Sequence, residues 1–280
     1  MLRNLKNHLY PQSIEETISL LQRPNSRILA GGTALTLSRD QTTDTLIDLQ
    51  GLGLSYIKEK EDCFIIGAMT SAYDIYRHEK LPKSLRTGAR RVGDTALLHA
   101  VTIGGNLARL YEWVDLPPVL WALDASVSLY ESGKRTLSAK EFFEYSRKKN
   151  VYRRQALITE VEVKKLPERS YSEYQSLTLT KNEKAQLNLA SFFSWDSGGL
   201  ISEVRLVLGA ATSYPVRLPI EKAIVGRNLT NALIDDCASR AAEGISLSND
   251  YKSSIEYRRQ ILGIYLKRTL KKCHTMIKVE

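Results

Sequence analysis

The order of apolar and polar residues changes its character near residue 167, and this change divides the chain into two parts. In the first part, short apolar runs alternate with segments of helical periodicity. A capping box at Ser13 and Glu16 predicts a helix that runs to about Gln22. Strands are expected at residues 27–30, 46–49, 63–68 and 156–163, helices at 70–76, 83–92, 116–123 and 138–145, and a hairpin at 126–130 and 135–137.

In the second part, the predicted strands come first and the predicted helices follow. Consecutive strands are expected at residues 171–179, 186–195 and 202–210, and helices at 218–225, 230–243 and 254–272. A run of strands followed by a run of helices is typical of an α+β domain. The pair Gly198-Gly199 lies between two alternating apolar runs, so we expect a hairpin turn there.

Two other glycine pairs lie among apolar residues rather than polar turn residues. The first is in Leu29-Ala30-Gly31-Gly32-Thr33-Ala34 and the second in Thr102-Ile103-Gly104-Gly105-Asn106. Glycine permits a positive φ and a close approach of the backbone to a ligand. Successive N–H groups in such a turn form a concave site for phosphate, and threonine hydroxyls add donors. We expect two loops that hold the two halves of one pyrophosphate; two purely structural turns are the alternative.

Composition and charge narrow the class of protein. Hydrophobic residues make up 43% of the 280 residues, which is enough for a packed core, and no apolar run reaches the roughly 18 residues of a membrane span. The N-terminal residues lack the apolar stretch of a secretory signal. The three cysteines, Cys63, Cys237 and Cys273, lack the spacing of a zinc or cluster site and suit a reducing cytoplasm.

The net charge of +9 invites a nucleic-acid interpretation, but no nucleic-acid motif accompanies it. Basic clusters such as residues 267–272 are interpreted as solvated helix faces or as a docking surface for acidic partner subunits. The chain has no G-x-G-x-x-G after a strand and no phosphate-binding P-loop motif. Its four histidines are not at metal-ligand spacing, and no catalytic triad or carboxylate pair stands out. Any enzymatic chemistry is therefore expected to come from a cofactor.

The two glycine motifs, followed by Asp115-Leu116-Pro117-Pro118, resemble the FAD-binding subunit of the molybdenum hydroxylases, the family of xanthine and carbon monoxide dehydrogenases. The resemblance also covers residues 10–13, 46–49, 66–70 and 122–125. It implies an α+β fold with a two-lobed FAD-binding domain of the vanillyl-alcohol-oxidase type at residues 1–167, its lobes at about 1–55 and 56–167. A small α+β C-terminal domain of antiparallel sheet and helices follows at 168–280.

The resemblance also implies which residues contact FAD. Those around the pyrophosphate are Leu29, Ala30, Gly31, Gly32, Thr33, Ala34, Thr102, Ile103, Gly104, Gly105 and Asn106. Asp115 is expected near the ribityl and phosphate region, with a helix N-cap as the equal alternative. Ile158 is expected at the adenine, with core packing as the better alternative. Asn188, or more weakly Lys181, is expected near the flavin ring. No catalytic residue and no metal ligand is expected on this chain.

The function that this resemblance implies is electron transfer within a multi-subunit oxidoreductase. FAD on this chain receives electrons from an iron–sulfur subunit, which a molybdopterin-binding subunit supplies, and passes them to NAD or another acceptor. The complex is expected to be a cytoplasmic hetero-oligomer without a membrane span or nucleic acid. One alternative is a self-sufficient FAD-dependent oxidase of the same fold class. A second alternative is a non-enzymatic basic protein that binds nucleic acid.

Overall fold

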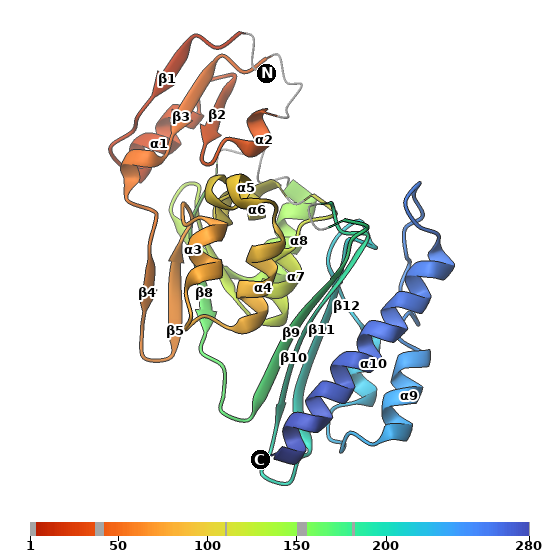
Figure 1. Cartoon of the computed structure of the whole chain (residues 1–280). Helices are drawn as coiled ribbons and strands as arrows, with labels where there is room; N and C mark the ends of the chain where they lie inside the picture. Colours follow the sequence, from red (N-terminus) through yellow and green to blue (C-terminus); the bar gives the residue numbers. More distant parts are fainter. Residues whose placement is uncertain (1–3, 37–41, 110, 150–155, 181–182, 280) are drawn as a thin grey trace. The chain divides into compact units, whose positions relative to one another are not determined.

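The computed structural model describes residues 4–36, 42–109, 111–149, 156–180 and 183–279. They form two compact units that are interleaved along the chain (Figure 1). The first unit comprises Met1–His78, Val92–Leu110 and Asp124–Lys164, and the second comprises Glu79–Arg91, Tyr111–Leu123 and Lys165–Glu280. Two segments that precede residue 167 thus belong to the second unit, and the domain boundary expected at that residue stays a prediction.

The first unit begins with a parallel three-stranded sheet that leads into the first glycine pair. Strands β1 (Asn7–Leu9) and β2 (Ser26–Leu29) pair with opposite edges of β3 (Thr45–Asp48), and the short 3₁₀ helix η1 (Gln50–Leu52) follows. Helix α1 (Ile14–Leu21) packs on this sheet through Leu20 and Leu21. The Ser13 hydroxyl accepts the Glu16 N–H at its start, as the predicted capping box requires, while the Glu16 carboxylate accepts the N–H of Gln12 instead of that of Ser13.

The rest of the first unit is built on a five-stranded antiparallel sheet. Its strands, in spatial order, are β4 (Ile57–Glu59), β5 (Cys63–Gly67), β8 (Leu157–Lys164), β6 (Ser126–Tyr130) and β7 (Lys134–Ser138). The predicted hairpin is confirmed as β6 and β7. Helix α8 (Ala139–Lys149) follows β7, with Ser138 and Glu141 bonded to each other at its start.

The described residues of the first unit also include short helices, the last of which contains the second glycine pair. They are α2 (Thr33–Thr36), α3 (Ala72–Arg77), α5 (Thr95–Ala100) and α6 (Ile103–Arg109). The helix expected from residue 70 begins two residues later, because the Ser71 hydroxyl caps it. The Thr70 hydroxyl instead donates a hydrogen bond to the Tyr56 carbonyl oxygen, 2.8 Å away, and accepts one from the Tyr56 N–H.

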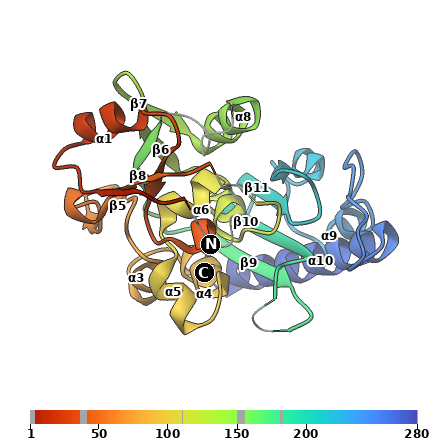
Figure 2. The same cartoon turned by 90° about the horizontal axis from the view of Figure 1, so that it is seen from above.

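The second unit is a four-stranded antiparallel sheet with helices packed on it. Its strands are β12 (Val216–Arg217), β11 (Ile201–Gly209), β10 (Leu187–Trp195) and β9 (Ser170–Leu177). Helices α4 (Lys83–Arg91) and α7 (Leu116–Ala122) contact it, as does α10 (Ile255–Val279), which lies along the strands beside α9 (Asn231–Ser239) (Figure 2). Strand β10 is buried along almost its whole length, so side chains on both of its faces are covered.

The predicted α+β class is confirmed, and the differences concern helix ends. Residues expected as a helix at 218–225 form only the 3₁₀ helix η3 (Pro219–Ala223), and α9 ends at Ser239. Helix α10 continues to Val279. Gly199, with φ of 79°, forms the expected hairpin turn between β10 and β11. Among the described residues, no helix combines the length and apolar character needed to cross a membrane.

Candidate cofactor-binding site

The first glycine pair forms the turn between β2 and α2, as the sequence predicts. Gly32 has φ of 73°, a left-handed conformation that glycine adopts without steric cost. Among the described residues, no turn hydrogen bond is donated by the N–H of Gly31, Gly32 or Thr33. The first N–H groups of a helix also lack acceptors within the helix. This segment can therefore donate several hydrogen bonds to an anionic ligand.

The second glycine pair does not form a turn, so that expectation is wrong. Gly104 and Gly105 lie in the first turn of α6, and neither is among the glycines with positive φ. Thr102 stands directly before the helix, and its hydroxyl accepts the Gly105 N–H at 3.2 Å. This is the role of a helix N-cap, for which threonine is well suited.

The remaining N–H groups at the start of α6 are bound within the protein. The Ile103 N–H donates to the Thr70 carbonyl at 3.0 Å, and the Gly104 N–H donates to the Ala68 carbonyl at 2.9 Å. A Cβ added to Gly104 would lie 2.7 Å from the Cβ of Ala68. Glycine is needed here because two backbone segments approach closely. These N–H groups are not available to a phosphate.

The two glycine motifs nevertheless lie against each other in the first unit. A Cβ added to Gly31 would lie 1.5 Å from the carbonyl oxygen of Ala100. Ala100 ends α5 and precedes Thr102 by two residues. The packing of the first turn on the end of α5 places both motifs where one small molecule can contact them.

Asn106 supplies a polar atom that the protein leaves unpaired. Its side-chain oxygen is buried and has no hydrogen-bond partner among the described residues. A buried amide oxygen without a partner is costly, so such an atom usually meets a ligand or an ordered water. Together with the free donors at residues 31–33, it makes this corner of the unit suitable for a polar cofactor.

Three other predicted contacts occupy less distinctive positions. Leu29 ends β2 and its carbonyl oxygen accepts the Leu49 N–H at 3.1 Å. Ala34 is the second residue of α2. Ile158 is buried in β8 opposite Leu129 of β6, in agreement with the alternative of core packing. Its contact with adenine stays a prediction.

Asp115 belongs to the second unit, where it is buried. It stands at the N-cap position of α7 but makes no capping hydrogen bond, so the alternative role of side-chain cap is wrong. The Tyr174 hydroxyl donates a hydrogen bond to its carboxylate instead. Burial raises the pKa of Asp115 to about 6, while the hydrogen bond from Tyr174 and the charge of Arg91 act in the opposite direction.

Asn188 is also fully buried in the second unit, on β10. Its side-chain amide donates to the Val114 carbonyl at 3.2 Å, and its side-chain oxygen has no partner among the described residues. Asn188 and Asp115 thus both fix the segment that leads into α7. Their contacts with FAD stay predictions. Lys181 lies outside the described residues.

Sequence reasoning did not identify several residues that shape this arrangement. The carbonyl oxygens of Ala68 and Thr70 accept the N–H groups at the start of α6, and Gly31 packs against the carbonyl oxygen of Ala100. Ala68 and Thr70 lie in the stretch 66–70 that the family resemblance covers, but the sequence did not indicate their hydrogen bonds to α6. Tyr174 is hydrogen-bonded to Asp115 across 59 positions of sequence, and nothing local indicated this pairing.

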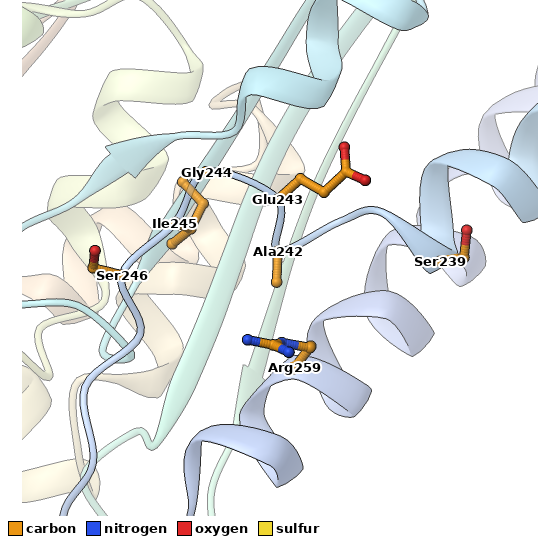
Figure 3. A pocket seen from close by; sticks show the side chains of 7 residues that line it. All are labelled: Ser239, Ala242, Glu243, Gly244, Ile245, Ser246 and Arg259. Atoms are coloured by element: carbon orange, nitrogen blue, oxygen red, sulfur yellow. The ribbon is translucent and has the colours of Figure 1, made fainter.

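A hollow elsewhere in the second unit contains none of the predicted residues. Figure 3 shows its lining residues, which are Ser239, Ala242, Glu243, Gly244, Ile245, Ser246 and Arg259. Glu243 is already paired with Arg240 at 3.0 Å. The hollow is open to solvent, and we assign no ligand to it. In the part of the chain that the structure describes, no three His, Cys, Asp or Glu side chains gather as a metal site.

Two family models account for nearly all of the sequence. Residues 4–165 match the model described as the FAD binding domain in molybdopterin dehydrogenase. Residues 172–273 match the CO dehydrogenase flavoprotein C-terminal domain. The chain is 27% identical to the glyceraldehyde dehydrogenase medium chain of Sulfolobus acidocaldarius, over 95% of this chain and 97% of that one. It is 24% identical to the carbon monoxide dehydrogenase medium chain of Afipia carboxidovorans, over 96% of each.

Solved structures share the fold. A chain of the carbon monoxide dehydrogenase from Hydrogenophaga pseudoflava matches with a TM-score of 0.88 at 23% identity, over 99% of both chains. A chain of quinoline 2-oxidoreductase from Pseudomonas putida 86 matches with a TM-score of 0.85 at 22% identity, over 98% of both. At these identities the structural likeness establishes the fold alone.

Proposed function

The chain belongs to the family of FAD-binding subunits of molybdopterin-dependent dehydrogenases, and from this premise we propose that it carries electrons out of such a complex. It is an oxidoreductase subunit, and FAD is its cofactor. Electrons would reach the FAD from an iron–sulfur subunit, which a molybdopterin-binding subunit supplies. They would leave to NAD or to another acceptor. The free, buried cysteines suit a cytoplasmic location.

The observation that supports this proposal best is the unpaired polar groups where the two glycine motifs meet. The N–H groups of residues 31–33 lack partners among the turn hydrogen bonds of the described residues, and the buried oxygen of Asn106 lacks one as well. Such groups fit the pyrophosphate and polar chain of a dinucleotide, which offer both acceptors and hydroxyl donors.

The residues of the two motifs would contribute to FAD binding in different ways, some by hydrogen bonds and some by packing. Gly31, Gly32 and Thr33 would donate hydrogen bonds to the pyrophosphate of FAD, and the Thr33 hydroxyl would add a further donor. Asn106 would accept a hydrogen bond from the cofactor. Gly104 and Gly105 would act through packing, because their N–H groups are bound within the protein. When bound, FAD accepts an electron pair and passes it on, while the protein holds and orients it.

The substrate of the complex is not set by this chain. The matching relatives are subunits of enzymes named for glyceraldehyde, carbon monoxide and other compounds, although their sequences match this chain over almost its whole length. We propose that substrate choice belongs to the molybdopterin-binding subunit. The acceptor can be examined on this chain alone, because NADH mixed with the flavin-loaded chain without oxygen should bleach the flavin if NAD is the natural acceptor.

The binding proposal is tested with the purified chain. FAD should be present by visible absorbance and, after denaturation, by mass. Thr33→Val removes one donor to a charged group, which is worth about 1.5–3 kcal/mol, so the dissociation constant should rise roughly 10- to 160-fold. Thr87→Val is the matched control, because the Thr87 hydroxyl is bonded to its own helix at the Lys83 carbonyl.

Asn106→Leu separates binding from folding. It removes a buried acceptor that has no partner in the protein. The variant should therefore unfold at an equal or higher denaturant concentration while it binds FAD less tightly. A wild-type chain that folds but takes up no FAD would contradict the proposal, as would unchanged FAD affinity in both the Thr33 and Asn106 variants.

A further inference from the structure

Helix α10 has one long face that the second unit leaves exposed. The opposite face is buried in the core through Leu262, Leu266, Leu270 and Cys273. The exposed side, which we term the outer face, consists of Tyr257, Ile264, Arg268, Lys271 and Lys278. Spacings of seven, four, three and seven residues place these side chains on one side of a helix with 3.6 residues per turn.

The cations of the outer face form no close ion pairs of their own among the described residues, although the charge of Lys271, together with that of Lys267, lowers the pKa of Asp235. Neither Arg268, Lys271 nor Lys278 forms an ion pair with any residue in the described part of the chain. The cations beside them differ, because Lys267 pairs with Asp235 at 2.6 Å and Lys272 pairs with Glu173. The unit thus neutralises the flanks of α10 and leaves the outer face positive.

Two apolar side chains accompany these charges. Tyr257 and Ile264 are each 44% exposed. A mixture of unpaired cations with an exposed aromatic and an exposed aliphatic side chain is typical of a protein interface, where opposite potentials meet around an apolar centre. A membrane surface would need the apolar stripe of the helix, and that stripe is buried in the core. Three cations without a recognised nucleic-acid motif are a weak footprint for nucleic acid.

We propose that the outer face of α10 docks an acidic surface patch of a partner subunit in the same complex. The proposal rests on the function proposed above, in which this chain works only beside other subunits. The net charge of +9 supports it, because it favours encounter with an acidic partner at low salt.

The test uses the complex purified from its own host through a tag on this chain. Arg268→Glu with Lys271→Glu reverses the centre of the outer face. Lys222→Glu with Arg227→Glu makes the same change of charge at exposed positions of the same unit outside α10. Iron and molybdenum per chain should fall at least tenfold in the first variant and stay at the wild-type level in the second. FAD per chain and the unfolding midpoint should not change in either.

Each other result has a defined meaning. Wild-type iron and molybdenum in the Arg268/Lys271 variant would overturn the docking proposal, and so would equal loss in both variants. Intact assembly combined with loss of salt-dependent binding to a DNA duplex would assign the face to nucleic acid and overturn it as well. If the wild-type chain holds iron and molybdenum but no FAD, the proposed function fails while the docking result stands on the metals per chain.

Discussion

The first unit contains two Gly-Gly pairs, and glycine is required at each for a different physical reason. Gly31-Gly32 forms a turn in which one residue has positive φ and the N–H groups of residues 31–33 donate no turn hydrogen bond among the described residues. Gly104-Gly105 lies in a helix whose first N–H groups are all bound by the protein. The comparison shows that a glycine pair in a sequence can indicate either a special backbone conformation or a lack of space, and only one of these leaves donors for a ligand.

Asp115 resembles the second pair in this respect. It is a polar residue that the family resemblance predicts near the cofactor, yet its carboxyl group accepts a hydrogen bond from Tyr174 within the second unit. The residues with free polar groups are the better candidates for direct contact with FAD. The following variants test this division, in order of decreasing effect.

Gly31→Ala should have the largest effect. Its Cβ would lie 1.5 Å from a backbone oxygen, so the turn and the end of α5 would have to separate. We expect a loss of at least about 3 kcal/mol, the upper end of overpacking effects, together with loss of FAD. Denaturant unfolding and FAD content measure both. Gly133→Ala, with no atom within 4 Å of the new Cβ, is the control.

Asp115→Asn should change how stability depends on pH. The folded pKa of Asp115 is raised to about 6 from 3.8, so the protein prefers the neutral carboxyl group. The wild type therefore loses up to about 3 kcal/mol from this group as the pH rises from about 4 to above 6. The Asn variant lacks this titration, and its unfolding free energy should vary less across the same range. Identical slopes in the two proteins would contradict the assignment.

Gly104→Ala should destabilise by about 1–2 kcal/mol. The new methyl group would lie 2.7 Å from the Cβ of Ala68 and 2.9 Å from its carbonyl oxygen, which destabilises the fold. The higher helix propensity of alanine offsets about 1 kcal/mol of this loss. Adding Ala68→Gly should recover part of the loss, because it removes the first of the two contacts. A double variant no more stable than the single one would speak against close packing as the reason for glycine.

Gly32→Ala should cost about 1 kcal/mol, because space is available and only the left-handed conformation is strained. Gly32→Asn should cost less, since asparagine tolerates this conformation better. Equal unfolding midpoints for the Ala variant and the wild type would show that the turn can change its conformation.

Gly105→Ala should be nearly neutral for stability. The new methyl group meets only the Thr102 hydroxyl, at 2.9 Å, and disturbance of this cap of about 1 kcal/mol offsets a similar gain in helix propensity. FAD content is the more informative measurement here. A variant that folds normally but holds no FAD would show that this side of α6 lies against the cofactor.

Local sequence patterns determined most of the secondary structure. The capping box at Ser13, the β6–β7 hairpin and the Gly199 turn each follow from residues within a few positions of one another. The same holds for β10 and β11, in which the apolar stretches Leu187/Leu189 and Val204/Leu206/Leu208 alternate. Helix ends were less predictable, as α9 and α10 show, because packing between elements decides where a helix stops.

The α+β class, the family and the first glycine turn could be predicted from the amino-acid sequence, because each depends on local conformation or on motifs in a fixed order. Which polar groups of the described residues lack a partner depends on contacts between distant segments. The Gly104 N–H is bound by Ala68, and Asp115 by Tyr174, across long separations in sequence. A hydrogen-bonding group can bind a cofactor only if no other part of the protein has already paired with it, and that depends on contacts that no local pattern specifies.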